Sequence, residues 1–298
     1  MMNTKLTFHT VHLRILVAIL LFGGVANAQE DSLDIVEPIG RPHKKIIIDT
    51  FKGTRLVNGH SAETKKQGEL ELIFGHRFGR LNSGRFNLWG LDESYLRMGF
   101  DYGITDRLDV GAGRNSYSKI YDVYLKYKWI SQGQDGEGSP FTITAFTSVG
   151  IQTFPRKSDD PTLSFFDRAT YTYQLLIARK MNPDFLLQVS PALLHTNRVD
   201  EELYNHDQVA IGVGGLYRIT DHLGVNFEYY YRIDPKTPGL NYNSLGIGFN
   251  IVTAGHVFQI ILSNTQGMTE RTFINQTAGQ FFKGDIHLGF NITRTFKL

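Results

Sequence analysis

The clearest pattern in the chain is an alternation of apolar and polar residues at its C-terminal end. Apolar side chains occupy every second position from Ile286 to Ile292 and return at Phe296 and Leu298, with polar or small residues between them. This alternation predicts a β-strand with one apolar and one polar face. The strand is longer than an average strand of a soluble protein and suits a tilted crossing of a bilayer. We therefore expect a transmembrane antiparallel β-barrel, closed by this last strand, with its apolar face in lipid.

The same alternation recurs along the chain and divides it into about twelve strands. One face of each strand is apolar, as at Leu96, Met98 and Phe100, and the other is polar, as at Arg97 and Asp101. A soluble sandwich would show the same periodicity, but strand length and the terminal strand favour a membrane barrel. The expected strands are 69–78, 93–103, 107–115, 120–130, 141–152, 168–180, 184–196, 207–218, 222–232, 243–251, 256–264 and 284–297.

The connections between these strands alternate in length. If the first strand runs outward, both termini are periplasmic and the even-numbered connections are periplasmic turns, which are short in bacterial barrels. Most are tight and carry the turn residues Asn, Asp, Pro and Gly, and the odd-numbered connections are mostly longer. The exceptions are 131–140, which is long, and 115–120, which is short.

The longest connection, 265–283, lies on the expected external side. It is richer in apolar residues than a solvated loop should be, which usually signals a contact. These residues are Met268, Phe273, Ile274, Phe281 and Phe282. We predict that this loop folds over or into the external mouth and narrows it. The alternative is a hairpin whose strands extend beyond the bilayer.

The N-terminal segment has the features of a secretory signal peptide. Lys5 and Arg14 precede a short apolar run, and Ala26-Asn27-Ala28 offers a cleavage site. We expect a signal peptide over 1–28, a periplasmic lead or plug segment over 29–68 and the barrel over 69–298. A retained N-terminal anchor is the alternative to cleavage. For residues 51–61 two interpretations are open. The segment forms a plug or a first pairing surface, or it is an ordinary lead-in strand.

Composition agrees with a barrel and argues against several kinds of partner and chemistry. The chain is 41% hydrophobic, which a barrel tolerates because only alternate residues face lipid. A net charge of +2 is too balanced to indicate a nucleic-acid partner. Without cysteine the chain forms no disulfide and offers no thiolate ligand. Catalytic and nucleotide-binding motifs are missing and the histidines lack metal-ligand spacing, so we expect neither an enzyme nor a cofactor or metal.

One pair of residues nevertheless raises the possibility of a membrane-embedded hydrolase. If strands 256–264 and 284–297 pair, Ser263 lies diagonally near His287 on the same face, and a serine beside a histidine is a possible nucleophile. The alternative is two polar lumen residues, which we favour because no orienting acid or oxyanion donor accompanies them.

Charged residues on the polar faces of the strands are the candidate functional positions. They could create a field that selects solutes, or pair with one another across strands. These lumen-lining candidates are Glu71, Arg97, Asp101, Asp122, Lys126, Lys128 and Glu228. Basic and aromatic residues of the external loops could contact lipopolysaccharide, or could simply be solvated. They are Arg80, Arg85, Trp89, Arg156, Lys157, Arg168 and Arg198.

Several segments together carry a family resemblance. They are 50–61, 75–82, 171–180, 255–259 and 283–291. The chain resembles a domain-of-unknown-function family of outer-membrane β-barrels from Gram-negative bacteria. The resemblance implies a barrel in the outer membrane, in contact with lipid and lipopolysaccharide, and implies no substrate and no catalytic residues.

The leading functional hypothesis is therefore a porin-like narrow pore or transport accessory for small solutes. A structural or interaction barrel that docks a periplasmic protein is the alternative. The membrane-embedded hydrolase is the third and weakest hypothesis.

Overall fold

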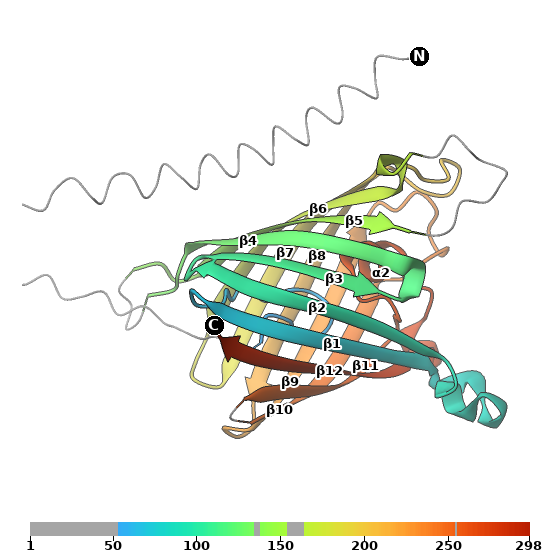
Figure 1. Cartoon of the computed structure of the whole chain (residues 1–298). Helices are drawn as coiled ribbons and strands as arrows, with labels where there is room; N and C mark the ends of the chain where they lie inside the picture. The colour runs from blue at the N-terminus through green and yellow to red at the C-terminus, as the bar shows by residue number, and fades with distance from the viewer. Residues whose placement is uncertain (1–52, 134–137, 154–163, 254) are drawn as a thin grey trace, which may run out of the picture. The chain divides into compact units, whose positions relative to one another are not determined.

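The computed structural model describes residues 53–133, 138–153, 164–253 and 255–298. The expected signal peptide, the lead up to residue 52, and Arg156 and Lys157 lie outside these residues. Within them, twelve strands form one closed antiparallel barrel in which β1 pairs with β12 and every other strand pairs with its neighbours in the chain (Figure 1). The predicted fold class and strand number are confirmed.

The strands begin and end within a few residues of the positions predicted from the alternation. They are β1 (Glu69–Arg80), β2 (Ser94–Thr105), β3 (Leu108–Asn115), β4 (Ile120–Ile130), β5 (Thr142–Gln152), β6 (Ala169–Lys180), β7 (Phe185–Thr196), β8 (Asp207–Arg218), β9 (Leu223–Ile233), β10 (Ser244–Val252), β11 (His256–Ser263) and β12 (His287–Lys297).

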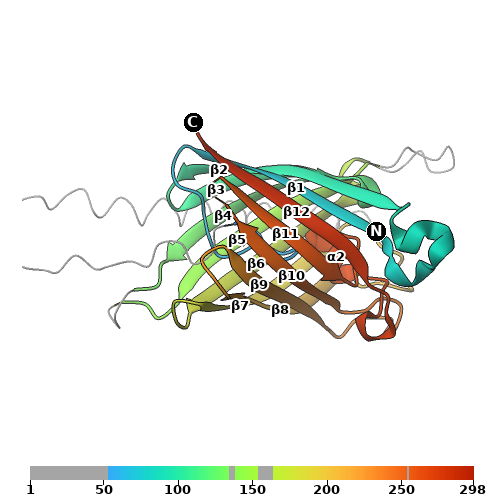
Figure 2. The same ribbon diagram turned by 90° about the horizontal axis from the view of Figure 1, so that it is seen from below.

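The terminal strand closes the barrel, as its pattern predicts. The pairing of β1 with β12 runs in continuous register from Glu69 opposite Lys297 to Arg77 opposite Gly289. Closure gives every strand two hydrogen-bonded neighbours, which a bilayer requires because lipid offers no partners for backbone N–H and C=O groups. Figure 2 shows the strands inclined across the barrel wall.

The two faces of the wall differ as the alternation requires. On the outer face large apolar side chains are exposed, among them Val123 at 62% and Met98 at 50%. On the inner face the intervening Arg97 and Asp122 are each only 4% exposed. An apolar outer surface around a charged interior suits a barrel whose solvent outside is lipid.

The two ends of the barrel carry different connections. One end of the barrel, here the turn end, has the tight connections after β2, β6, β8 and β10. The first residue of β1 and the last residue of β12 also lie at this end. Its turns are built by local hydrogen bonds: Thr105 and Thr220 each accept one at 3.0 Å from the backbone N–H three residues later. We assign this end to the periplasm because periplasmic turns are short, and this orientation stays a prediction.

Most connections at the opposite end, here the loop end, are longer, but the one after β3 is short and the long one after β4 lies at the turn end. The loop end also carries all the described helical turns except α2. They are η1 (Leu81–Ser83), η2 (Arg85–Gly90), η3 (Tyr117–Lys119), η4 (Phe166–Arg168) and η5 (Phe281–Lys283). From this end α2 (Glu270–Asn275) folds into the barrel (Figure 1). In the described part of the chain, no helix has the length and apolar character needed to span a membrane.

Candidate functional site

The lumen is filled by two segments that enter from opposite ends. Residues 53–65, the lumen hairpin, come from the turn end and fold back on themselves at Val57 and Asn58. The Leu56 N–H donates to the Gly59 carbonyl and the Ser61 N–H to the Thr54 carbonyl, each at 2.9 Å. The described part of the segment 51–61 is therefore an occupant of the lumen, rather than a lead-in strand of the barrel.

Glu228 of β9 binds the tip of the lumen hairpin. Its carboxylate accepts three backbone hydrogen bonds, from Val57 at 3.4 Å, Asn58 at 3.1 Å and Gly59 at 2.8 Å. Hydrogen bonds to an ionised carboxylate are about twice as strong as neutral ones. The tip also fits closely, because a Cβ on Gly59 would lie 2.5 Å from the Tyr230 hydroxyl.

Side-chain amides of the wall satisfy the carbonyl groups of the same tip. Asn226 of β9 donates to the Leu56 carbonyl, and Gln259 of β11 donates to the same oxygen at 3.0 Å. Asn291 of β12 donates to the Val57 carbonyl at 3.0 Å. Buried backbone groups need partners, and here strands far apart in the chain supply them.

The returning leg of the lumen hairpin is held in the same way. Gln188 of β7 accepts from the Ala62 N–H and donates to the His60 carbonyl, both at 2.8 Å. Thr144 of β5 donates to the Ala62 carbonyl at 2.6 Å. A glutamine that bonds a backbone N–H and a C=O pairs with the hairpin backbone as a neighbouring strand would.

At the turn end the lumen hairpin is bound by charged groups. The Lys65 ammonium lies 2.6 Å from Glu71, and the Lys65 N–H donates to the Asp109 carboxylate at 2.9 Å. Glu71 also accepts from the Thr54 hydroxyl at 2.7 Å. A cavity of about 310 Å³ lies beside this part of the hairpin, and Arg55 and Gln259 belong to its lining.

The second segment, α2, is held mainly by apolar packing. Phe273 and Ile274 are fully buried in a cluster with side chains of β7, β8 and β9, and the Phe273 ring lies 5.1 Å from that of Tyr230. The prediction that 265–283 folds into a mouth of the barrel is thus confirmed for Met268, Phe273 and Ile274, whereas Phe281 is half-buried. It is wrong for Phe282, which is 93% exposed because η5 turns that residue away from the barrel. That this mouth is the external one stays a prediction.

The two segments meet inside the lumen at Glu270. Its carboxylate lies 3.9 Å from the Arg55 guanidinium and 3.6 Å from His60 Nε2. Arg55 lies over the Tyr124 ring at 5.5 Å, and the His60 ring lies 4.3 Å from that of Phe146. Burial raises the pKa of Glu270, and burial with the nearby Arg55 lowers the pKa of His60 well below its ordinary value. Both shifts therefore act toward the neutral form of each group.

All seven lumen-lining candidates from the sequence face the interior, and most of them bind the lumen hairpin. Besides Glu71 and Glu228, Lys126 donates to the Glu63 carbonyl and Lys128 lies 2.9 Å from the Glu63 carboxylate. Lys128 is the one candidate that is not fully buried.

The remaining candidates pair within the wall. Arg97 of β2 forms an ion pair with Asp122 of β4, and Asp101 accepts a hydrogen bond from the Tyr124 hydroxyl. Of the two alternatives raised by the sequence, pairing across strands therefore applies to these three candidates, and Tyr124 is the partner of Asp101. A third role, binding of the hairpin, was not among the alternatives.

The sequence reasoning missed the amide side chains of the site. Gln188, Asn226, Gln259 and Asn291 occupy polar positions of the same alternation, yet only charged residues were selected. Their position on the inward face was available as a signal. Their function as partners of the hairpin backbone was not, because it depends on where residues 53–65 lie.

The serine and histidine considered for a hydrolase lie directly opposite each other in the pairing of β11 with β12, rather than diagonally. Their hydrogen bonds go elsewhere. The Ser263 hydroxyl donates to the Leu245 carbonyl at 3.0 Å, and His287 Nδ1 lies 3.0 Å from the Phe78 carbonyl. Among the residues that the structure describes, no group of three His, Asp or Glu side chains is placed to hold a metal ion.

The fold and the lumen define a membrane-bound barrel with an occupied interior. Residues 51–296 match the family described as "Membrane bound beta barrel domain (DUF5777)", and the chain belongs to this family. The expected family and a lipid environment are thereby confirmed. No curated protein matches the chain.

Among solved structures the chain is similar in fold to outer-membrane porins. The NanC porin shares 10% identity at a TM-score of 0.48, covering 77% of this chain and 100% of that one. The KdgM porin shares 8% at 0.46, covering 76% and 99%. The outer membrane phospholipase A from Escherichia coli shares 12% at 0.40, covering 76% and 89%. These likenesses concern the barrel fold alone.

Proposed function

We propose that the protein is a gated pore for small polar solutes, closed in this structure by the lumen hairpin. The observation that carries the proposal is the chemistry of the hairpin's attachment. The wall holds its backbone through carboxylates, amides and ammonium groups, as at Glu228, Gln188 and Lys126. Apolar contacts of the hairpin are limited to a few side chains such as Leu56 and Ala62.

Such an attachment suits a segment that can leave. Each neutral hydrogen bond contributes only about 1 kcal/mol net, and each bond to a charged group about 1.5–3 kcal/mol, because water replaces the partner when the bond breaks. Withdrawal of the hairpin would leave a wall of charged and amide side chains that water can hydrate. A barrel built only as a scaffold would need no such wall, since apolar side chains could fill it. Twelve strands lie between the eight-stranded barrels that side chains fill and the sixteen-stranded barrels that hold open channels.

The two ends of the lumen support the same proposal. Beside the hairpin at the turn end is the cavity of about 310 Å³, and at the loop end α2 borders a second cavity of about 390 Å³. Hairpin and α2 lie between them and contact each other at Glu270. Two water-accessible vestibules separated by a closing segment are the arrangement that a gated pore requires.

Conductance of the purified protein in planar bilayers tests the proposal. Three proteins are compared: the unchanged chain, one in which a Gly-Ser linker of equal length replaces 53–65, and one in which 266–279 is also replaced. We expect rare openings of the first and frequent, longer openings of the second and third. Heat-dependent gel migration and a β-rich circular dichroism spectrum confirm that each barrel is folded.

Solute flux gives the second readout. Proteoliposomes with the linker variants should swell in L-arabinose faster than those with the unchanged chain. Folded barrels that neither conduct nor admit arabinose after both replacements would overturn the pore. That outcome would favour the alternative of a barrel that docks a periplasmic protein.

A further inference from the structure

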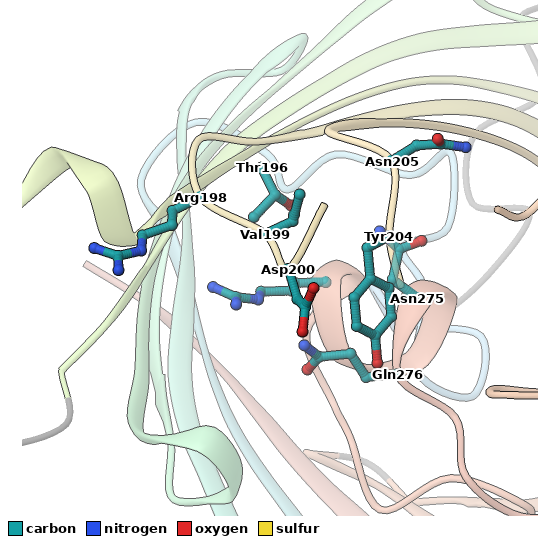
Figure 3. A pocket seen from close by; sticks show the side chains of 9 residues that line it. Thr196, Arg198, Val199, Asp200, Tyr204, Asn205, Asn275 and Gln276 are labelled. Carbon is teal, nitrogen blue, oxygen red and sulfur yellow. The ribbon is translucent and has the colours of Figure 1, made fainter. Parts of the chain in front are cut away.

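A polar pocket opens at the loop end, between the connection 197–206 and α2. It encloses about 390 Å³, within the range of small-molecule sites. Asp200 and Tyr204 of the connection face Asn275 and Gln276 at the end of α2 across it (Figure 3). Arg271 completes the α2 side of the lining.

Arg271 brings an unneutralised cation to this pocket. The guanidinium makes no ion pair within the described part of the chain, and its one hydrogen bond goes to the Arg168 carbonyl at 3.5 Å. Burial lowers the pKa of Arg271, and no carboxylate of a described residue opposes this effect. Arg271 is half-buried, and burying even part of a charge without a partner is costly. An anionic ligand would remove this cost, and a carboxylate fits the two parallel donors of a guanidinium.

Asn275 adds a hydrogen-bond acceptor on the same side. It lies one helical turn after Arg271, so both side chains project from the same face of α2. Its Oδ1 atom is buried and accepts no hydrogen bond from any described residue. An anion alone cannot satisfy this oxygen, because it needs a donor. A ligand with a hydroxyl or N–H group close to its negative charge would satisfy both Arg271 and this oxygen.

The opposite side of the pocket orients such a ligand. The Asp200 carboxylate would repel the ligand's negative end and accept hydrogen bonds from its hydroxyl groups. The Tyr204 ring offers a flat apolar face beside it (Figure 3). Repulsion at one side and attraction at the other discriminate between orientations and between ligands.

We propose that this pocket binds a small hydroxylated carboxylate, of the size and class of a sugar acid, with its carboxylate on Arg271 and a hydroxyl on Asn275. Arg271 directly follows Glu270, which contacts the lumen hairpin. The ligand therefore binds the short helix that contacts the closing hairpin. That the pocket is the entry site of a pore rests on the proposed function, whereas binding itself does not.

Calorimetric titration of the full-length protein in detergent tests the site without any pore activity. D-Glucuronate and D-glucose form a matched pair that differs in the carboxylate, and inorganic phosphate tests charge without hydroxyl groups on carbon. Glucuronate should bind at least about tenfold more tightly than glucose or phosphate, as the loss of one charged hydrogen bond predicts. Arg271→Gln should weaken glucuronate binding by a similar factor, and Asn275→Leu by a smaller one.

Arg85→Gln, on an exposed loop position, is the matched control and should bind as the unchanged chain does. Equal binding of glucuronate and glucose, or unchanged binding by Arg271→Gln, would overturn the site. If phosphate bound as tightly as glucuronate, the conclusion that the ligand carries hydroxyl groups would be wrong. Titration does not depend on conductance, so the two proposals can fail separately. If the barrel binds glucuronate but never conducts, the proposed pore is wrong and the proposed site stands.

Discussion

The two segments inside the barrel are attached by opposite means. The lumen hairpin is bound through its backbone by polar wall groups, with Glu228 alone accepting three N–H bonds. In α2, by contrast, Phe273 and Ile274 are buried among apolar side chains of three strands. Burial of a large apolar side chain contributes about 1.5–3 kcal/mol, whereas a hydrogen bond exchanged with water contributes about 1 kcal/mol net.

The comparison indicates which segment moves. Withdrawing α2 exposes apolar surface on the helix and on the wall, and water does not compensate either surface. Withdrawing the hairpin exposes mostly polar groups, which water hydrates. We therefore infer that α2 is a fixed constriction and the lumen hairpin the mobile one, in agreement with the proposed pore.

The largest expected effect follows from removing the apolar anchor of α2. Phe273→Ala should weaken the docking of α2 by about 3 kcal/mol or more, because it removes a fully buried ring and leaves a cavity. Trypsin cleavage after Arg271 should accelerate by about a hundredfold if cleavage requires α2 to undock. The rate is measured on the folded barrel in detergent.

Phe282→Ala provides the control, because that ring is 93% exposed and its loss should leave cleavage unchanged. Equal cleavage rates in Phe273→Ala and the unchanged chain would show that α2 is held by other contacts, and the contrast between the two segments would fail.

A smaller effect is expected at the tip of the lumen hairpin. Glu228→Gln replaces the charged acceptor of three N–H groups by a neutral one and should weaken docking of the hairpin by roughly 2 kcal/mol. Ser61→Cys serves as the reporter, because Ser61 is fully buried and the native chain has no cysteine. Thiol labelling should become at least about tenfold faster.

Glu202→Gln in the same reporter background, at an exposed loop position, should not change the labelling rate. If Glu228→Gln labelled no faster than this control, the carboxylate would not be what retains the hairpin.

The smallest expected effect is a pH dependence at the junction of the two segments. The pKa of His60 is lowered from its ordinary value of 6.5 while the hairpin is docked. Docking is therefore strongest above pH 6.5 and weakens as the pH falls below it, because the released histidine takes up a proton that the docked one does not. The change is at most about tenfold per pH unit. The raised pKa of Glu270 acts in the opposite direction, so we expect the effect in the Glu270→Gln background.

Labelling of Ser61→Cys in that background, with and without His60→Gln, measures this effect. The ratio of the two rates removes the pH dependence of the thiol itself. It should rise as the pH decreases below 6.5. A constant ratio down to pH 5 would exclude His60 as the titrating group.

Much of the wall could be predicted because each strand carries its own signal. In β12 the alternation of Leu288, Phe290 and Ile292 with His287 and Asn291 specifies both faces without reference to any other strand. Lipid on one side and a polar interior on the other impose this pattern on every strand. The inward position of Arg97, Asp122 and Glu228 follows from it.

The partners of those inward residues could not be predicted in the same way. Arg97 and Asp122 are on strands that are not neighbours, and Glu228 binds backbone groups about 170 positions earlier in the chain. Residues 53–65 show no periodicity, because their backbone is held by side chains from many strands rather than by a ladder. The apolar residues of 265–283 indicated a buried segment, but Phe282 could not be distinguished from Phe273.

The sequence by itself therefore determined a twelve-stranded membrane barrel with a charged interior, because lipid contact is a local requirement that each strand meets separately. Only the tertiary structure decided what the interior contains. The lumen hairpin and α2 are positioned by groups that converge only when the barrel closes, and that convergence leaves no trace in the spacing of residues along the chain.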